Sequence, residues 1–277
     1  MKRRQNITRE VRDGWVRKFE KLNKHSRLYY SFITTQDIKS MGSKSRTPDF
    51  EERGQDRDLL STNERMFFYR LRFSKKFVSI KEQYPLLPLE RVIGVAKQLG
   101  VRYPTYPYSR SVEVVMTSDF VCKTLSGKLV VYSIKDTKAF KNLSEAQRKN
   151  LDNKLKIEKA FWESKGATWY LILSEQIKTI FAQNLEQLFP SCSLSVKLQI
   201  FHPRWLQLFS KKGLSYKKQR LSELVTAIAL ELGISYQESV EICQFCIWNK
   251  HIKANLSSIK LRYELSLEQL GCDVNRG

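Results

Sequence analysis

The chain has 277 residues and a formal net charge of +21, from 49 Lys and Arg against 28 Asp and Glu. Its 42% hydrophobic content excludes a disordered chain, and five cysteines are too few for a disulfide-rich secreted scaffold. No apolar run approaches the ~20 residues that span a bilayer, so we expect a cytoplasmic protein with no membrane partner. The basic excess is spread along the sequence, which favours a polyanionic partner, above all nucleic acid.

Helical and extended patterns alternate in the N-terminal part of the sequence. The apolar positions of residues 7–22 recur at helical spacing. Residues 40–58 are polar and rich in turn-forming residues, which predicts a loop. A second helix is expected after Ser61 or Thr62, either of which can cap it. The run KFVSIKEQYPLLPLE then begins as a strand, and residues 89–99 return to a helix.

The middle of the sequence changes to β-branched and aromatic runs of strand length, at residues 111–122, 128–136 and 168–174. A Ser-Gly pair between the first two predicts a hairpin. A charged helix is expected at about residues 144–165, between the last two strands. This order of strands and helix predicts a mixed α/β layer with a crossover connection.

The C-terminal part is helical again, with short helices predicted at residues 201–212, 221–232 and 235–248. The tail HIKANLSSIKLRYELSLEQL alternates weakly, as a small hairpin or wing would. Helices followed by a hairpin are the outline of a winged-helix module. The expected parts of the chain are a basic helical and loop region that packs on the core (1–60), an α/β domain (61–195) and a winged-helix-like domain (196–277).

Glu64, Asp119 and Lys135 form a candidate catalytic set. Asp119 and Lys135 lie on successive predicted strands, so both side chains are expected at one edge of the sheet, where the second helix can bring Glu64. Two carboxylates hold a hard cation such as Mg²⁺, which binds phosphate oxygens and activates water, and a lysine offsets charge on the phosphate. This is the chemistry of a phosphodiester nuclease. By spacing alone, three unrelated surface residues remain the simpler interpretation.

A longer set of motifs carries more information. The runs LLSTNERMFFYRLRFSKKFVSIKEQYPLLPLE, VRYP, VEVVMTSDFVC, VYSIKDTKAF and NKLKIEKAFWESKG follow one another between about residues 30 and 175. In order and spacing they resemble the TnsA family, the endonuclease subunits of Tn-seven-like heteromeric transposases. The likeness becomes thin beyond residue 195.

The resemblance implies an α/β restriction-endonuclease-like core with a mixed sheet, followed by an all-helical, winged-helix-like domain that contacts DNA and an ATPase regulator. It implies cutting of the non-transferred strand at the 5′ ends of a transposon during cut-and-paste transposition. Mg²⁺ is the implied cofactor, with Mn²⁺ as a substitute. The implied partners are transposon-end DNA, a TnsB-like transposase and a TnsC-like AAA+ ATPase, in a bacterial cytoplasm and at the nucleoid.

Carried over residue by residue, the resemblance assigns Glu64 and Asp119 to the metal, together with the backbone carbonyl of Ile134, and Lys135 to catalysis. Ser133 departs from the family, where Gln or Glu stands two residues before the lysine. A serine is a weaker metal ligand, which leaves the number of metal ions open. It also keeps open a second hypothesis, a DNA-binding assembly subunit with weak or no nuclease activity.

Glu158 has two interpretations. It falls where the family also has an acidic residue, so it is a candidate support of the site through Lys135 or a metal-bound water. Alternatively, it is a solvated helix glutamate with an i,i+4 partner such as Lys154.

Further basic residues are candidates for phosphate contacts, although each is equally well explained as solvated surface. They are Arg3, Arg4, Lys138, Lys141, Lys211, Lys212, Lys217 and Lys218. Cys243 and Cys246 form a CxxC pair that suggests a zinc site, but core packing on a buried helix explains them better. The three histidines have no paired spacing and predict no catalytic role.

Overall fold

The computed structural model describes residues 7–37, 43–52, 54–107, 109 and 111–272. Arg3 and Arg4 lie outside the described residues. The chain divides into two compact units, which we call unit 1 (Met1–Arg65 and Ser74–Ile177) and unit 2 (Met66–Phe73 and Lys178–Gly277). The boundary expected near residue 195 therefore falls inside unit 2.

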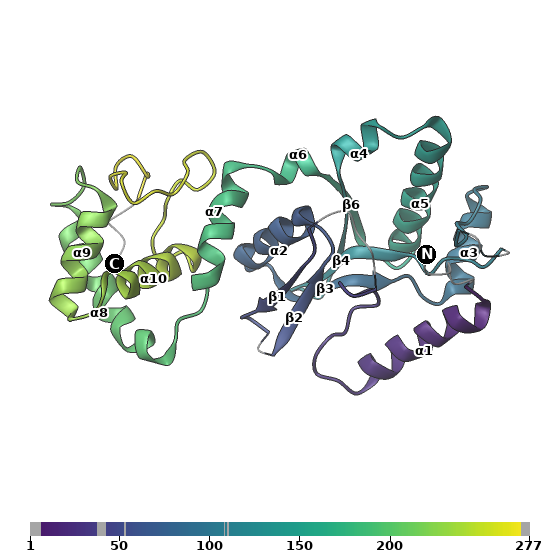
Figure 1. Ribbon diagram of the computed structural model, residues 1–277, viewed down its shortest axis with the longest axis horizontal. Helices are drawn as coiled ribbons and strands as arrows, with labels where there is room; N and C mark the ends of the chain where they lie inside the picture. Colours follow the sequence, from purple (N-terminus) through teal and green to yellow (C-terminus); the bar gives the residue numbers. More distant parts are fainter. Residues whose placement is uncertain (1–6, 38–42, 53, 108, 110, 273–277) are drawn as a thin grey trace, which may run out of the picture. The chain divides into compact units, whose positions relative to one another are not determined.

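Unit 1 is built on a four-stranded mixed sheet with the order β3-β4-β5-β6 (Figure 1). The strands are β3 Phe77–Pro85, β4 Thr117–Thr124, β5 Leu129–Lys135 and β6 Thr168–Leu173. The first three are antiparallel, whereas β5 and β6 are parallel and are joined through α5, Glu145–Glu163. The predicted hairpin and crossover are both confirmed, although the first predicted strand begins only at Thr117.

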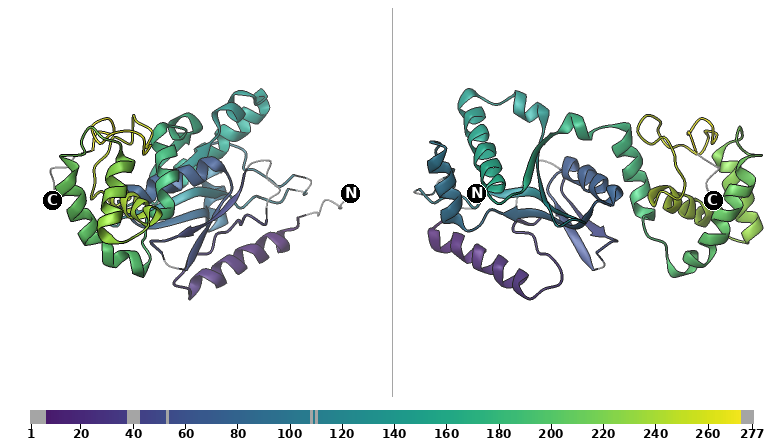
Figure 2. Two further views of the ribbon diagram at one scale, coloured as in Figure 1. Left: turned by 60° about the vertical axis from the view of Figure 1, so that its left-hand side comes forward. Right: turned by 180° about the vertical axis from the view of Figure 1, so that it is seen from behind.

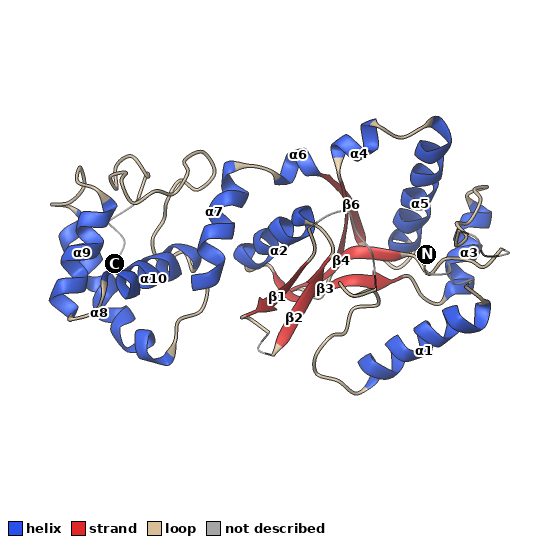
Figure 3. Ribbon diagram, viewed as in Figure 1, coloured by secondary structure: helices blue, strands red, loops and turns tan. Residues whose placement is uncertain are grey.

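Helices α3 (Leu89–Gln98) and α5 cover one face of this sheet (Figure 3). The core there contains Val92 of α3, Val121 and Val131 of the central strands, and Phe161 of α5. Helix α5 starts with a capping box, in which Ser144 accepts from the Gln147 amide and the Gln147 side chain accepts from the Ser144 amide. The shorter helices α4 (Thr137–Lys141) and α6 (Ser174–Ile177) follow β5 and β6.

Residues 43–59 contain a hairpin, where the sequence predicts a loop. It is formed by β1 (Ser45–Asp49) and β2 (Gln55–Leu59). Its buried side includes Leu59 but is otherwise polar, and the fully buried Arg57 contacts Asp49 at 2.7 Å and Glu82 of β3 at 3.1 Å. The prediction was wrong because it looked for apolar alternation, and here buried ion pairs take the place of apolar side chains.

Helix α1 (Arg9–Lys24) falls in the segment predicted to be helical and is capped by Thr8, whose hydroxyl accepts from the Val11 amide. It packs beside the segment between α3 and β4 (Figure 2). Arg12 pairs with Glu113 at 2.8 Å, and the rings of Trp15 and Tyr106 lie 6.0 Å apart. These contacts fix the N-terminal helix on unit 1.

Unit 2 is helical in its described part. Its elements are the Met66–Phe73 part of α2 (Thr62–Ser74), α7 Ile180–Leu188, the 3₁₀ helix η1 Phe189–Ser191, α8 Val196–Gly213, α9 Leu221–Leu232 and α10 Tyr236–Trp248. The last three confirm the three predicted C-terminal helices, α8 starting five residues earlier than expected. No helix in the described ranges has both the length and the apolar character of a membrane span.

The predicted wing is not confirmed. Residues 249–272, all of them described, contain no strand and follow turns drawn as loop in Figure 3. Their backbone forms hydrogen bonds with the buried Asn184 instead. The Asn184 side chain donates to the carbonyls of Leu256 (2.8 Å) and Ile259 (2.7 Å) and accepts from the amide of Leu261 (2.8 Å). A side chain thus satisfies backbone groups that a hairpin would have paired.

Candidate active site

Strand register brings three polar side chains of unit 1 into one row. Glu82 of β3 pairs with Phe120 of β4, which pairs with Tyr132 of β5. The next position in this register therefore brings Gln83 of β3, Asp119 of β4 and Ser133 of β5 side by side. Residues opposite one another in antiparallel strands face the same side. Lys135, two residues after Ser133, shares this face, which is also the face that α5 covers.

Asp119 and Lys135 are in direct contact. The Asp119 Oδ2 atom accepts hydrogen bonds from the Ile134 amide at 2.5 Å and from Lys135 Nζ at 3.2 Å. Lys135 Nζ also donates to the Ile134 carbonyl at 2.9 Å. Burial works against the charged ammonium, but the negative charges of Asp119 and Glu158 outweigh it and raise the pKa of Lys135. The lysine is therefore held as a cation against the carboxylate.

Glu64 reaches this site from the first turn of α2. Ser61 caps the helix by accepting from the Glu64 amide at 3.2 Å, and its hydroxyl donates to Glu64 Oε1 at 2.9 Å. The other oxygen, Oε2, accepts from the Leu60 amide at 3.0 Å and from Gln83 Nε2 at 3.1 Å. Burial, followed by the charge of Asp119, raises the pKa of Glu64 to about 7. The two carboxylates are thus close enough to interact.

Gln83 is a site residue that sequence analysis missed. Its amide donates to Glu64 and accepts from Thr117 Oγ1 at 3.2 Å, so it orients the carboxylate. Its backbone φ of +47° lies in the left-handed region, which costs a glutamine roughly 1 kcal/mol. Strain of this kind often occurs at functional sites. The only signal in the sequence was its place within the EQYPLLP motif.

Glu158 joins the site from α5. It is 3% exposed, and burial, followed by the charge of Asp119, raises its pKa to about 7. Its Oε1 atom has no hydrogen-bond partner among the described residues. The interpretation of Glu158 as a solvated helix glutamate is therefore wrong, because its side chain faces the sheet and not solvent.

Two comparisons with known proteins bear on this site. Residues 74–174 match a family described as "TnsA-like endonuclease N terminal". The chain is also 27% identical over 165 residues to the Transposon Tn7 transposition protein TnsA of Escherichia coli, over 60% of this chain and 57% of that protein. This part of the chain is similar to TnsA.

The TnsA-like match supports a nuclease. It covers the row of Gln83, Asp119 and Ser133 together with Lys135 and Glu158, whereas Glu64 precedes it. The chain spans a little over half the length of its Escherichia coli relative.

Ser133 lies beside Asp119 at the β5 end of this row. It is 1% exposed. Its side chain is shorter than the Gln or Glu expected there, and unlike Glu it carries no charge. The structure thus places a short, neutral hydroxyl next to Asp119.

The remaining basic candidates are distributed over both units. Lys138 and the exposed Lys141 belong to α4, directly after β5, and Lys141 lies 3.7 Å from Glu175. The other four lie at and after the end of α8 in unit 2: Lys211, Lys212, Lys217 and Lys218. Lys212 is paired with Glu231 at 2.8 Å, which partly neutralises it.

The TnsA-like site suits a hard divalent cation by the chemistry of its donors. Glu64, Asp119 and the Ile134 carbonyl offer oxygen atoms, the ligands that Mg²⁺ prefers. Three carboxylates crowd around one lysine, and two of them have a raised pKa because their negative charges are buried together. The unbonded Glu158 Oε1 adds a buried acceptor. The residues present therefore fit Mg²⁺.

Proposed function

We propose that this chain is the Mg²⁺-dependent endonuclease subunit of a transposase. It cuts the non-transferred strand at the 5′ ends of a transposon during cut-and-paste transposition, and Mn²⁺ replaces Mg²⁺. The observation that carries the proposal is the convergence of Glu64, Asp119 and Lys135 on one face of a TnsA-like domain.

The site residues divide the work of phosphodiester hydrolysis. Glu64, Asp119 and the Ile134 carbonyl would hold Mg²⁺, which when bound would supply charge neutralisation at the phosphate and water activation. Lys135 stands against Asp119 and offers an ammonium group to the negative charge that develops on the phosphate. Gln83 and Ser61 keep Glu64 oriented through direct hydrogen bonds. Glu158 accepts a proton or anchors a water beside Lys135.

The partners in this proposal are transposon-end DNA, a TnsB-like transposase that acts on the 3′ ends, and a TnsC-like AAA+ ATPase. The net charge of +21 supports a DNA partner. We assign the ATPase and further DNA contacts to the helical C-terminal unit, and place the protein in the bacterial cytoplasm, at the nucleoid during transposition.

A second function is favoured by one observation. The buried Ser133 lies across from Asp119 and weakens the ligand set. On that ground the alternative is a DNA-binding assembly subunit with weak or absent cutting.

Strand-specific cleavage of a labelled transposon-end duplex tests both functions. The reaction contains Mg²⁺, the partner transposase and the ATPase, and compares the wild type with Asp119→Asn. The matched control is Asp56→Asn, since Asp56 is an exposed aspartate on the β1–β2 hairpin. We expect a 5′-end cut in the wild type and the control but not in Asp119→Asn. Joining of 3′ ends without any 5′ cut in the wild type favours the assembly subunit.

A further inference from the structure

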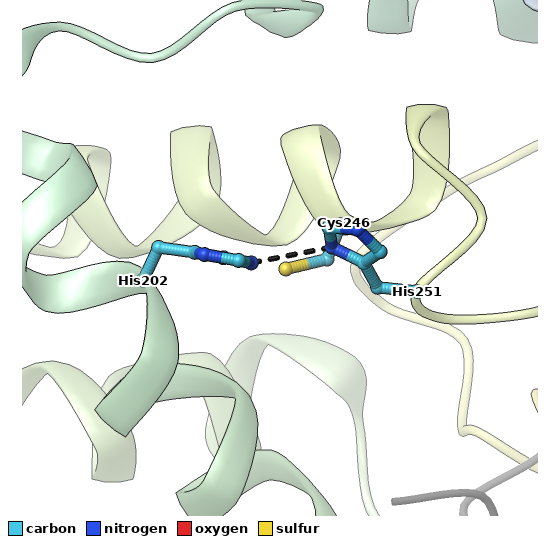
Figure 4. Close-up of side chains that lie close together, drawn as sticks. All are labelled: His202, Cys246 and His251. Atoms are coloured by element: carbon cyan, nitrogen blue, oxygen red, sulfur yellow. Dashed lines mark hydrogen bonds between the residues drawn. The ribbon is translucent and has the colours of Figure 1, made fainter.

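Unit 2 contains a second cluster of side chains that is independent of the nuclease site. His202 of α8, Cys246 of α10 and His251 after α10 each offer one metal-binding atom, and these atoms all lie within 4.8 Å of one another. His202 Nε2 and His251 Nδ1 are 3.2 Å apart. Figure 4 shows the two imidazoles and the thiol converging on one point.

The end of α10 explains how His251 reaches this point. The helix stops at Trp248, and Lys250 adopts a left-handed φ of +64°. The amides of His251 and Ile252 then both donate to the Cys246 carbonyl, at 2.8 and 3.1 Å. The chain thereby turns back on the last helical turn and brings the His251 ring beside the Cys246 thiol.

Phe245 holds both imidazoles in place. Its ring makes edge contacts with His202 at 5.1 Å and with His251 at 5.8 Å. Two histidines from different elements are thus packed against one aromatic ring, with their nitrogens facing each other. A preorganised pair of this kind loses less entropy when it binds an ion.

The geometry matches the requirements of a soft divalent cation. Zinc binds imidazole nitrogen at ~2.0–2.1 Å and thiolate sulfur at ~2.3 Å in tetrahedral sites, which places two nitrogens about 3.3 Å apart. The observed nitrogen separation is 3.2 Å. We propose that His202, Cys246 and His251 form a Zn²⁺ site in the C-terminal unit.

The surroundings are consistent with a three-ligand site. Cys246 is fully buried, whereas His202 is half-buried and His251 is exposed, so the cluster opens to solvent on one side. Zinc sites with three protein ligands keep a fourth position for water or an incoming group.

Only one cysteine of the CxxC pair belongs to this site. Cys243 is equally buried, but the described cluster contains only Cys246, with His202 supplied by a different helix. Core packing therefore accounts for Cys243. The site is also chemically distinct from the oxygen-rich cluster of unit 1, because nitrogen and sulfur ligands select Zn²⁺ over Mg²⁺.

Metal content and cobalt spectroscopy test the proposal on the full chain, with any affinity tag removed. We expect the purified protein to retain about one Zn²⁺ per chain after dialysis. Replacing it with Co²⁺ should give visible bands of tetrahedral cobalt and a thiolate-to-cobalt charge-transfer band. Zn²⁺ should displace the cobalt, and an excess of Mg²⁺ should not.

Matched variants identify the ligands. His251→Gln and Cys246→Ser should each weaken Zn²⁺ binding by at least about 100-fold, since even residues behind the ligands contribute 10–100-fold. Cys246→Ser should also remove the charge-transfer band. The controls are Cys243→Ser, a buried cysteine one turn away, and His25→Gln, an exposed histidine in unit 1. Both controls should bind as the wild type does.

Three results overturn the proposal: a wild type that binds neither Zn²⁺ nor Co²⁺, a charge-transfer band that survives Cys246→Ser, or unchanged affinity in His251→Gln. The first would mean that the imidazoles form only a hydrogen bond. Because His251 is exposed, His251→Gln keeps the test valid even if Cys246→Ser fails to fold.

Discussion

The two units each bring together polar side chains from distant parts of the sequence, but with different chemistry and by different means. Unit 1 aligns Gln83, Asp119 and Ser133 through the register of three strands, and its candidate ligand atoms are oxygen. Unit 2 places His251 beside Cys246 through the turn that ends one helix, and its candidate ligand atoms are nitrogen and sulfur.

The two sites differ in how charge is controlled. In unit 1 burial, followed by the charge of Asp119, raises the pKa of Glu64 and Glu158, and Lys135 provides the compensating positive charge. In unit 2 the cluster contains no carboxylate. We therefore expect the first site to respond to pH and to hard cations, and the second to soft cations.

The largest effect is expected when the positive charge of Lys135, which compensates the buried carboxylates, is removed. Lys135→Met should reduce cleavage by about 10³-fold, since the ammonium is the group that faces the developing phosphate charge. Metal binding should persist, because the carboxylates remain. Single-turnover cleavage and Mn²⁺ titration measure the two effects. Lys128→Met, in the exposed hairpin turn, is the control, and equal activity of the two variants would remove Lys135 from the site.

The raised pKa values predict an unusual pH dependence of stability in unit 1. Glu64 has a pKa of about 7 in the folded chain against an ordinary 4.5, so the folded state binds the proton more tightly than the unfolded state. Without divalent cations, stability should therefore fall as pH rises from about 4.5 to 7, by on the order of 2 kcal/mol for this group.

Thermal unfolding in EDTA across this pH range measures the effect. Glu64→Gln should flatten the fall, and Mg²⁺ should reverse it by favouring the ionised carboxylates. Glu163→Gln, an exposed glutamate at the end of α5, should leave the slope unchanged. A slope that is the same in Glu64→Gln and the wild type would contradict the assignment.

Gln83→Leu tests whether the uncharged neighbour of Asp119 in this row contributes to cleavage. Loss of its hydrogen bond to Glu64 should reduce cleavage about tenfold, comparable to one hydrogen bond to a charged group. The same bond lowers the pKa of Glu64, so the rise of activity with pH should move to higher pH in the variant. Gln98→Leu, at the exposed end of α3, is the control. An unshifted pH profile would argue that Gln83 is only structural.

The smallest expected effect concerns Lys138 on α4. Lys138→Ala should weaken binding of any DNA duplex a few-fold and reduce the salt dependence of binding by about one counterion. Fluorescence anisotropy at several salt concentrations measures both quantities. The hairpin variant Lys128→Ala should show neither change, and a matching change in that variant would deny Lys138 a particular role.

Local patterns predicted most of the sheet and helices because β-branched runs and amphipathic spacing report directly on burial. The hairpin around Arg57 was missed because its buried side is charged. In the site, Asp119 and Lys135 were identified through motif resemblance, whereas Gln83 required the strand register. The pair His202 and His251, 49 residues apart in sequence, required the fold of unit 2.

Helix α2 has a consequence for how this protein can be inherited or engineered. It carries Glu64 in its first turn, while Met66–Phe73 belong to the other unit, where Tyr69 stacks on Phe189 at 4.2 Å. Consider a chimera in which residues 178–277 are replaced by those of a relative. The original Met66–Phe73 segment would then have to pack against the helices of the relative. Such a chimera needs the matching α2 segment as well, so a working exchange has to include Met66–Phe73.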